Sequence, residues 1–177
     1  MRARPEETVE AGRESVVSPA ESDLVQKTQI QIRQWVQEIS ELAESDCSVD
    51  AFFEGFLTRI VSALASIGGA IWMRDDEQSP LSLRYQINLE QTGLKSSESM
   101  QIRHGQLLNQ TLARGETSLA APSSGSSEST ESANPTPCLL LFGIISLDKQ
   151  SKGVVEIFQR PGAGPATQRG SLRFISQ

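Results

Sequence analysis

Two amphipathic helices are predicted in the first part of the chain. From Leu24 onward, apolar residues recur every three or four positions with polar residues between them, which predicts a long helix ending near Ser45. Ser48 can cap a second helix that carries Asp50 in its first turn and stops at glycines 68–69. The apolar positions of the two helices are Val25, Ile32, Trp35, Val36, Ile39 and Leu42, then Val49, Phe52, Phe53, Phe56, Leu57, Ile60, Val61 and Leu64. The second stripe is broad and is expected to face a substantial core.

After the glycines the period of the apolar positions changes to two. Residues 70–73 and 81–85 predict the strands of a hairpin, joined by the polar turn 75–80. Between Ser97 and Gly115 the pattern is helical again, and Gly115 is placed to end the last turn. Its apolar side holds Met100, His104, Leu107, Leu108 and Leu112. A third, less apolar helix is therefore predicted.

The last part of the chain predicts two strong strands and a helix. Residues 138–147 are almost continuously apolar, as in a central strand covered on both faces. Residues 153–158 alternate, so the two faces of this strand are expected to meet different surroundings. Residues 121–136 are polar and predict a flexible loop, and 168–177 begin a helical pattern that we expect to continue into a longer protein.

Charge and composition limit the function classes. Residues 1–23 are charged and lack an apolar face, so we expect a disordered N-terminal tail before one domain over 24–177. A net charge of −6 opposes binding to nucleic acid or to anionic lipid. The longest apolar stretch, 138–145, is too short for direct membrane insertion, and no secretory signal is visible. With only two cysteines, these features predict a cytoplasmic location.

The order helix, helix, hairpin, helix, short strand, hairpin, helix resembles the GAF domain family. The resemblance is sharpest in the segments 60–72, 107–116 and 152–157, and it extends over residues 24–177. It implies an α+β fold of the GAF/PAS-like kind, with a central antiparallel sheet and helices on both faces. It also implies a regulatory module, because many members bind a small molecule beside the sheet or dimerise through their terminal helices.

The chain departs from the specialised branches of that family. It lacks the Asn-Lys, Phe and Asp-Glu pattern of the cyclic-nucleotide-binding members and the Cys-His pair of the bilin-binding ones. Cys47 and Cys138 do not resemble the clustered cysteines of the methionine sulfoxide reductase branch. We therefore expect neither of these ligands, no cofactor and no enzymatic activity.

Few residues offer catalytic or metal-binding chemistry. His104 is the only histidine, so a site with two imidazoles is excluded. A structural role is expected for it, with a lone general base or an axial ligand as the alternatives. Cys138 opens an apolar strand without a basic neighbour and is expected to be an inert buried thiol. The acidic run 75–77 predicts a solvated turn rather than a cation site, and the glycine-rich run 161–165 lacks the features of a phosphate loop.

Five residues are candidates for a ligand pocket: Trp72, Tyr85, Met100, His104 and Leu108. In the resembled fold their segments surround the cavity on the open face of the sheet. The alternative is that they are ordinary core residues, because an aromatic side chain in a strand can face either layer. Trp35 likewise fits either a helix-to-helix dimer seam or packing within the chain.

Three functions are compatible with these features. The leading hypothesis is a non-catalytic sensory module that binds a small molecule or relays a signal through its terminal helices. The alternative is a dimerisation or scaffold domain at the N-terminus of a larger signalling or membrane-associated transport protein, acting as a homodimer through the terminal helices. A small enzyme is the third, suggested only by the presence of Cys138 and His104.

Overall fold

A computed structural model describes residues 19–94, 97–123, 134–147 and 150–176. Its helices are α1 (Pro19–Glu44), α2 (Val49–Ala63), the 3-10 helix η1 (Leu89–Thr92), α3 (Glu98–Arg114) and α4 (Pro165–Ile175). Its strands are β1 (Gly68–Met73), β2 (Ser82–Ile87), β3 (Ser118–Ala120), β4 (Leu139–Leu147) and β5 (Gln150–Gln159). The strands form one antiparallel sheet in the order β2-β1-β5-β4-β3. The predicted α+β class with a central antiparallel sheet is confirmed.

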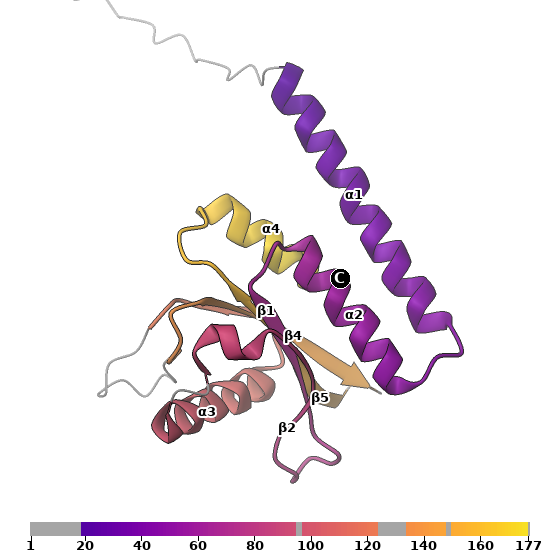
Figure 1. The fold of residues 1–177 in the computed structure, drawn as a ribbon. Helices are drawn as coiled ribbons and strands as arrows, with labels where there is room; N and C mark the ends of the chain where they lie inside the picture. Colours follow the sequence, from indigo (N-terminus) through magenta and orange to yellow (C-terminus); the bar gives the residue numbers. More distant parts are fainter. Residues whose placement is uncertain (1–18, 95–96, 124–133, 148–149, 177) are drawn as a thin grey trace, which may run out of the picture.

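The sheet separates two apolar cores. Helix α3 covers one face, and α2 with α1 and α4 covers the other (Figure 1). The α3-side core consists of Ala70, Leu89, Leu94, Leu107, Leu108, Leu112, Cys138, Leu140, Phe142, Val154 and Phe158. The α2-side core consists of Leu57, Ile60, Val61, Ile71, Leu139, Leu141, Val155, Ile157 and Phe174. Successive residues of β4 and β5 thus enter different cores. This confirms that residues 138–147 are covered on both faces and that the two faces of the second strand meet different surroundings.

Local capping sets the helix ends that the sequence predicts. The hydroxyl of Ser48 accepts a hydrogen bond from the backbone N–H of Ala51 at 3.2 Å. The hydroxyl of Ser97 does the same for Met100 at 3.3 Å. Gly115 ends α3 with φ of +68°, a left-handed conformation that glycine adopts without steric cost. Each cap supplies a partner or a conformation that the free helix end requires.

The two terminal helices begin earlier than their apolar periodicity suggests. Helix α1 starts at Pro19 rather than Leu24, so residues 19–23 are helical, and the rest of the predicted tail, 1–18, lies outside the described residues. Helix α4 starts at Pro165 rather than 168. Both starts are prolines, whose missing N–H and fixed φ suit the first helical turn. Within the described residues, none of the helices combines the length and hydropathy needed to cross a membrane.

Trp35 packs within the chain. Its ring meets that of Phe174 from α4 edge to face, with centroids 6.3 Å apart and planes at 72°. It belongs to the partly buried side chains that cover the α2-side core. The first half of α1 extends past the rest of the domain (Figure 1). Of the two alternatives for Trp35, the structure therefore shows the intramolecular one.

The segment predicted as a flexible loop has a C-terminal end that is buried and hydrogen-bonded. Residues 124–133 lie outside the described part of the chain. Asn134 is 1% exposed, and its amide Nδ2 donates to the carbonyl oxygens of Ala121 at 2.9 Å and Cys138 at 2.8 Å. Its Oδ1 accepts from the backbone N–H of Thr136 at 2.9 Å and from the Thr136 hydroxyl at 2.8 Å. Residues 134–136 therefore connect the end of β3 to the start of β4 through hydrogen bonds.

An extra residue interrupts the pairing of β1 with β2. Ile71 lies opposite Tyr85 and Trp72 lies opposite Leu83, so Arg84 has no counterpart. Such a β-bulge changes the phase of the strand. As a result Leu83 and Tyr85, although two positions apart, face opposite sides of the sheet.

Candidate functional site

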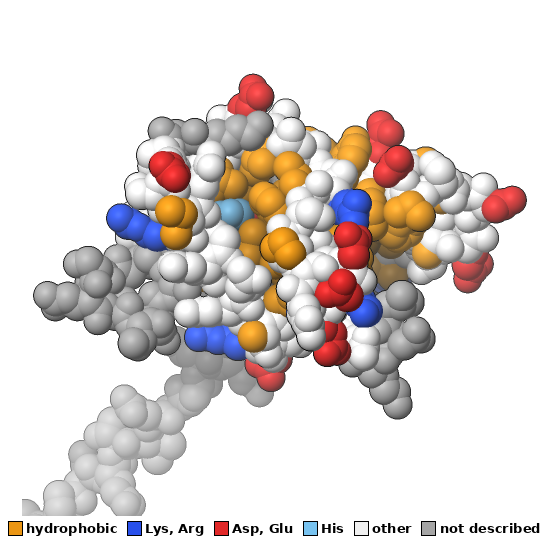
Figure 2. Space-filling view, turned by 90° about the horizontal axis from the view of Figure 1, so that it is seen from below, with side chains coloured by type: hydrophobic (Ala, Val, Ile, Leu, Met, Phe, Trp, Pro, Cys, Tyr) orange, Lys and Arg blue, Asp and Glu red, His pale blue; other side chains and the backbone are white. Residues whose placement is uncertain are grey.

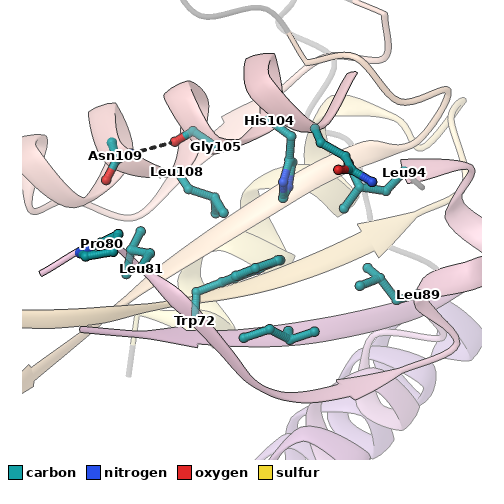
Figure 3. Close-up of a pocket in the computed structure, with 11 residues that line it drawn as sticks. Trp72, Pro80, Leu81, Leu89, Leu94, His104, Gly105, Leu108 and Asn109 are labelled. Atoms are coloured by element: carbon teal, nitrogen blue, oxygen red, sulfur yellow. Dashed lines mark hydrogen bonds between the residues drawn. The ribbon is translucent and has the colours of Figure 1, made fainter. Parts of the chain in front are cut away.

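A cavity of about 360 Å³ lies between α3 and the β1–β2 hairpin (Figure 3). It is lined by Trp72, Pro80, Leu81, Leu83, Leu89, Leu94, Gln101, His104, Gly105, Leu108 and Asn109. In the space-filling view the histidine, pale blue, lies in a hollow surrounded by apolar side chains (Figure 2). The volume falls at the small end of the roughly 300–1,000 Å³ usual for small-molecule sites.

A fully buried carboxylate holds two aromatic rings at this cavity. Glu156 of β5 is 0% exposed, and its Oε2 accepts a hydrogen bond from Nε1 of Trp72 at 2.9 Å. Its Oε1 lies 2.7 Å from Nε2 of His104. An acidic side chain in an apolar core is strongly unfavourable without such partners. We call Glu156, Trp72 and His104 the Glu156 triad.

The triad fixes the relative orientation of the two rings. Trp72 projects from β1 and His104 from α3, and both rings line the cavity (Figure 3). Their centroids are 5.5 Å apart and their planes are inclined by 59°. Nε2 of His104 is engaged by Glu156, and within the described part of the chain its second nitrogen, Nδ1, has no hydrogen-bond partner and is available to another group.

The surroundings of the cavity offer little catalytic chemistry. Cys138 is 3% exposed in the α3-side core; burial raises the pKa of its thiol, and the negative charge of Glu156 raises it further. A protonated buried thiol is a poor nucleophile. Cys47 is exposed, and neither cysteine is in a disulfide. In the described part of the chain, no group of three or more His, Cys, Asp and Glu residues is arranged to hold a metal ion.

The structure brings three of the five candidate pocket residues together. Trp72, His104 and Leu108 all line the cavity. Met100 lies in the first turn of α3 and is not among the lining residues. Tyr85 packs on the α2-side core, because the bulge at Arg84 turns it to the opposite face. The grouping of Tyr85 with the pocket residues is therefore corrected.

Other pocket residues were not among the candidates. Glu156 had a signal in the sequence, since a single acid in the middle of an apolar strand requires a buried partner. Gln101 and Asn109 had none, because polar residues on a helix predict a solvent-facing side. The leucines contributed by β2 and η1 depend on the bulge and on a 3-10 helix that no local pattern indicated.

Gly105 keeps the helical wall of the cavity open. It lies in the middle of α3, where glycine costs about 1 kcal/mol relative to alanine. A Cβ atom built at this position meets nothing within 4 Å, so packing does not demand a glycine. Gln101, Gly105 and Asn109 follow one another at four-residue spacing, which places them along one stripe of the helix. Two amide side chains thus flank an empty position at the cavity.

Comparison with known proteins identifies the fold. No family model and no curated protein matches the sequence. The GAF domain of A. aeolicus nlh2 in an inactive state superposes with a TM-score of 0.61 at 15% identity, covering 84% of this chain and 90% of that one.

Two further solved structures are similar. The GAF domain of an Acinetobacter phosphoenolpyruvate-protein phosphotransferase has a TM-score of 0.53 at 15% identity, covering 89% of each chain. A GAF domain/HD domain protein from Geobacter sulfurreducens has a TM-score of 0.52 at 13% identity, covering 75% of this chain and 90% of that one. Identities this low bear on the fold alone. With its five-stranded antiparallel sheet between α3 and the α2 layer, the chain has a GAF-like fold.

Proposed function

We propose that this domain is a non-catalytic regulatory module that binds a small molecule in the cavity between α3 and the sheet. The observation that carries the proposal is a cavity of about 360 Å³ with two aromatic rings held by a buried carboxylate. Concave, largely apolar sites with a few fixed polar groups are typical of ligand pockets. The likeness to GAF domains supports a sensory role.

The lining residues favour binding over catalysis. Histidine paired with a carboxylate can act as a general base when a nucleophile lies within reach. Among the described residues that line the cavity, none is Ser, Thr, Cys, Lys or Tyr. The missing side chain at Gly105 instead leaves free space in the cavity wall, through which a ligand can enter.

A route for signal relay runs through β5. Glu156 faces the pocket side of the sheet, while its neighbours Val155 and Ile157 enter the α2-side core. A ligand that moves the His104 ring also moves the carboxylate and the backbone that carries it. Because adjacent residues of a strand point to opposite faces, that displacement reaches the layer of α2 and α4 across a single sheet. In this proposal the terminal helices transmit the displacement to whatever the domain regulates.

A leucine at position 105 tests the pocket. In Gly105→Leu the new side chain occupies the open wall, and binding of fragments from a small-molecule library is expected to weaken at least about 10-fold, or ~1.4 kcal/mol. The helix itself gains stability from the loss of glycine. Binding is measured by NMR, following the indole N–H signal of Trp72 and the backbone signals of α1 and α4.

The matched control is Gly170→Leu in α4. Gly170 is also a helical glycine whose Cβ would meet nothing within 4 Å, but it lies on the other side of the sheet. The Gly170→Leu variant should gain stability in the same way and keep the Trp72 response. Only the Trp72 signal is compared for this control, because Gly170 itself lies in α4 and lines the groove between α1 and α4. A wild-type protein that binds no fragment, or a Gly105→Leu variant that binds them equally well, would refute the small-molecule proposal.

A second candidate function is homodimerisation through the terminal helices. At about 1.5 Å per residue, the 26-residue α1 is about 39 Å long and the 15-residue α2 about 22 Å. Among the elements that the structure describes, none lies against the part of α1 that extends beyond α2 (Figure 1), and helices without packing are marginally stable in water. A groove between α1 and α4 is lined by Ile32, Val36 and Phe174. Helix α1 of a second copy of the chain would both cover the uncovered part of α1 and fill this groove.

Sedimentation equilibrium with a pair of matched variants tests the dimer. Ile30 is 59% exposed on α1 and lies one turn before Arg33 and two turns before Gln37, which line the groove. Ile30→Glu is expected to weaken self-association at least about 10-fold. Ile102→Glu, at an equally exposed site on α3 (57%), should leave it unchanged. A wild-type protein that stays monomeric at high concentration contradicts this function.

A further inference from the structure

The charge of the cavity limits what it can bind. Of the eleven residues that line it, His104 is the only titratable one, and none is Lys, Arg, Asp or Glu. A phosphate or carboxylate needs a cationic partner or several N–H donors to replace its water. The described lining has no cationic side chain beyond what His104 can offer, and its N–H donors are limited to the amides of Gln101 and Asn109. The chain as a whole carries a charge of −6.

The Glu156 triad works against charged ligands of either sign. Its carboxylate lies directly behind the rings of Trp72 and His104, so an anion in the cavity would meet a negative potential. A cation gains no contact with that carboxylate, because Glu156 is 0% exposed and its two oxygens already have ring partners. Either ion would lose hydration without a direct counter-charge.

The shape of the cavity favours a flat ring. Trp72 and His104 present two aromatic surfaces inclined by 59°, and leucines from β2, η1 and α3 close the sides (Figure 3). Aromatic molecules stack or meet edge to face on such surfaces at centroid distances of about 4.5–7 Å. The stripe from Gln101 to Asn109 lies along the same cavity.

The polar groups suit a neutral molecule with a hydrogen-bonding edge. Nδ2 of Asn109 donates to the carbonyl oxygen of Gly105 at 2.9 Å, which leaves Oδ1 to accept from a ligand. The amide of Gln101 can both donate and accept. Nδ1 of His104 adds a third position, since Nε2 is held by Glu156. These groups match the donors and acceptors of an amide or a heteroaromatic ring.

We infer that the cavity takes an uncharged, planar aromatic or heteroaromatic molecule with a polar edge. The inference rests on the proposed function and names the ligand class of that site. Its strongest support is the combination of two fixed ring surfaces, an uncharged polar stripe and a buried carboxylate behind them.

Three isosteric probes separate this class from its charged counterparts. Benzamide, benzoate and benzamidine share a phenyl ring and a planar head group and differ in charge. Each is titrated into the ¹⁵N-labelled wild-type chain while the indole N–H signal of Trp72 is followed. A spectrum of Trp35→Phe assigns that signal, since the chain has two tryptophans. Benzamide is expected to shift it and to bind at least about 10-fold more tightly than either ion.

Each outcome decides the matter. Benzoate or benzamidine binding as tightly as benzamide overturns the ligand class, and so does benzamide leaving the Trp72 signal unmoved. If a charged probe binds and Gly105→Leu abolishes its binding, the regulatory pocket stands and only its ligand class is wrong. If neither these probes nor any library fragment shifts the signal, the proposed function fails as well.

Discussion

Replacing Glu156 with leucine is expected to lower the free energy of unfolding by about 3–5 kcal/mol. The substitution leaves Nε1 of Trp72 and Nε2 of His104 without the carboxylate that each now meets at 2.9 and 2.7 Å. Buried polar groups without partners lose their hydration and gain nothing in return. Urea unfolding followed by far-ultraviolet circular dichroism measures the change.

Glutamine at position 156 is the matched control. Its amide oxygen can accept from Trp72, and its N–H can donate to a neutral His104 ring, so both contacts survive. Glu156→Gln should therefore cost no more than about 1.5 kcal/mol. A leucine variant as stable as the glutamine variant would show that shape, and not hydrogen bonding, holds the triad together.

Asn134→Ala is expected to cost about 3 kcal/mol, the second largest effect. The side chain bridges the carbonyl oxygens of Ala121 and Cys138 and accepts two hydrogen bonds from Thr136. At 1% exposure, water cannot replace these contacts. The loss is measured as a lower urea midpoint with an unchanged slope.

Aspartate at position 134 separates the contribution of the side-chain oxygen, Oδ1, from that of the amide donor, Nδ2. Asn134→Asp keeps the oxygen that Thr136 donates to, but it removes the amide donor and turns an oxygen toward two carbonyl groups. It should be at least as destabilising as alanine. Near wild-type stability for Asn134→Asp would mean that the bonds to Ala121 and Cys138 contribute little.

Features encoded by short stretches of sequence were predictable. Ser48 and Ser97 precede helices and act through a backbone N–H only three residues away, and Gly115 ends α3 through its own conformation. The two-core arrangement followed from the composition of residues 138–147, because an almost continuously apolar strand has to be covered on both faces. Trp72, His104 and Leu108 were grouped at one cavity because of the resemblance to the GAF family, and all three line the cavity of the structure.

Features that depend on distant residues were not predictable. The side to which Tyr85 turns is decided by a bulge that exists only in the pairing of β1 with β2. The partners of Glu156 are 52 and 84 residues away in the sequence. The polar stretch around Asn134 has the composition of a solvated loop, and only its contact with the neighbouring strands buries it. In each case a non-local contact overrides the local pattern.

The bulge at Arg84 also bears on self-assembly. Strand β2 forms one edge of the sheet, and a regular, uncharged edge would invite the strand of another molecule to extend it. Here the extra residue breaks the regular spacing of the outward N–H and C=O groups, and the exposed Arg84, paired with Asp75, adds charge at that point. The bulge and the charge at Arg84 thus disfavour growth into open-ended β-aggregates along this edge of the sheet.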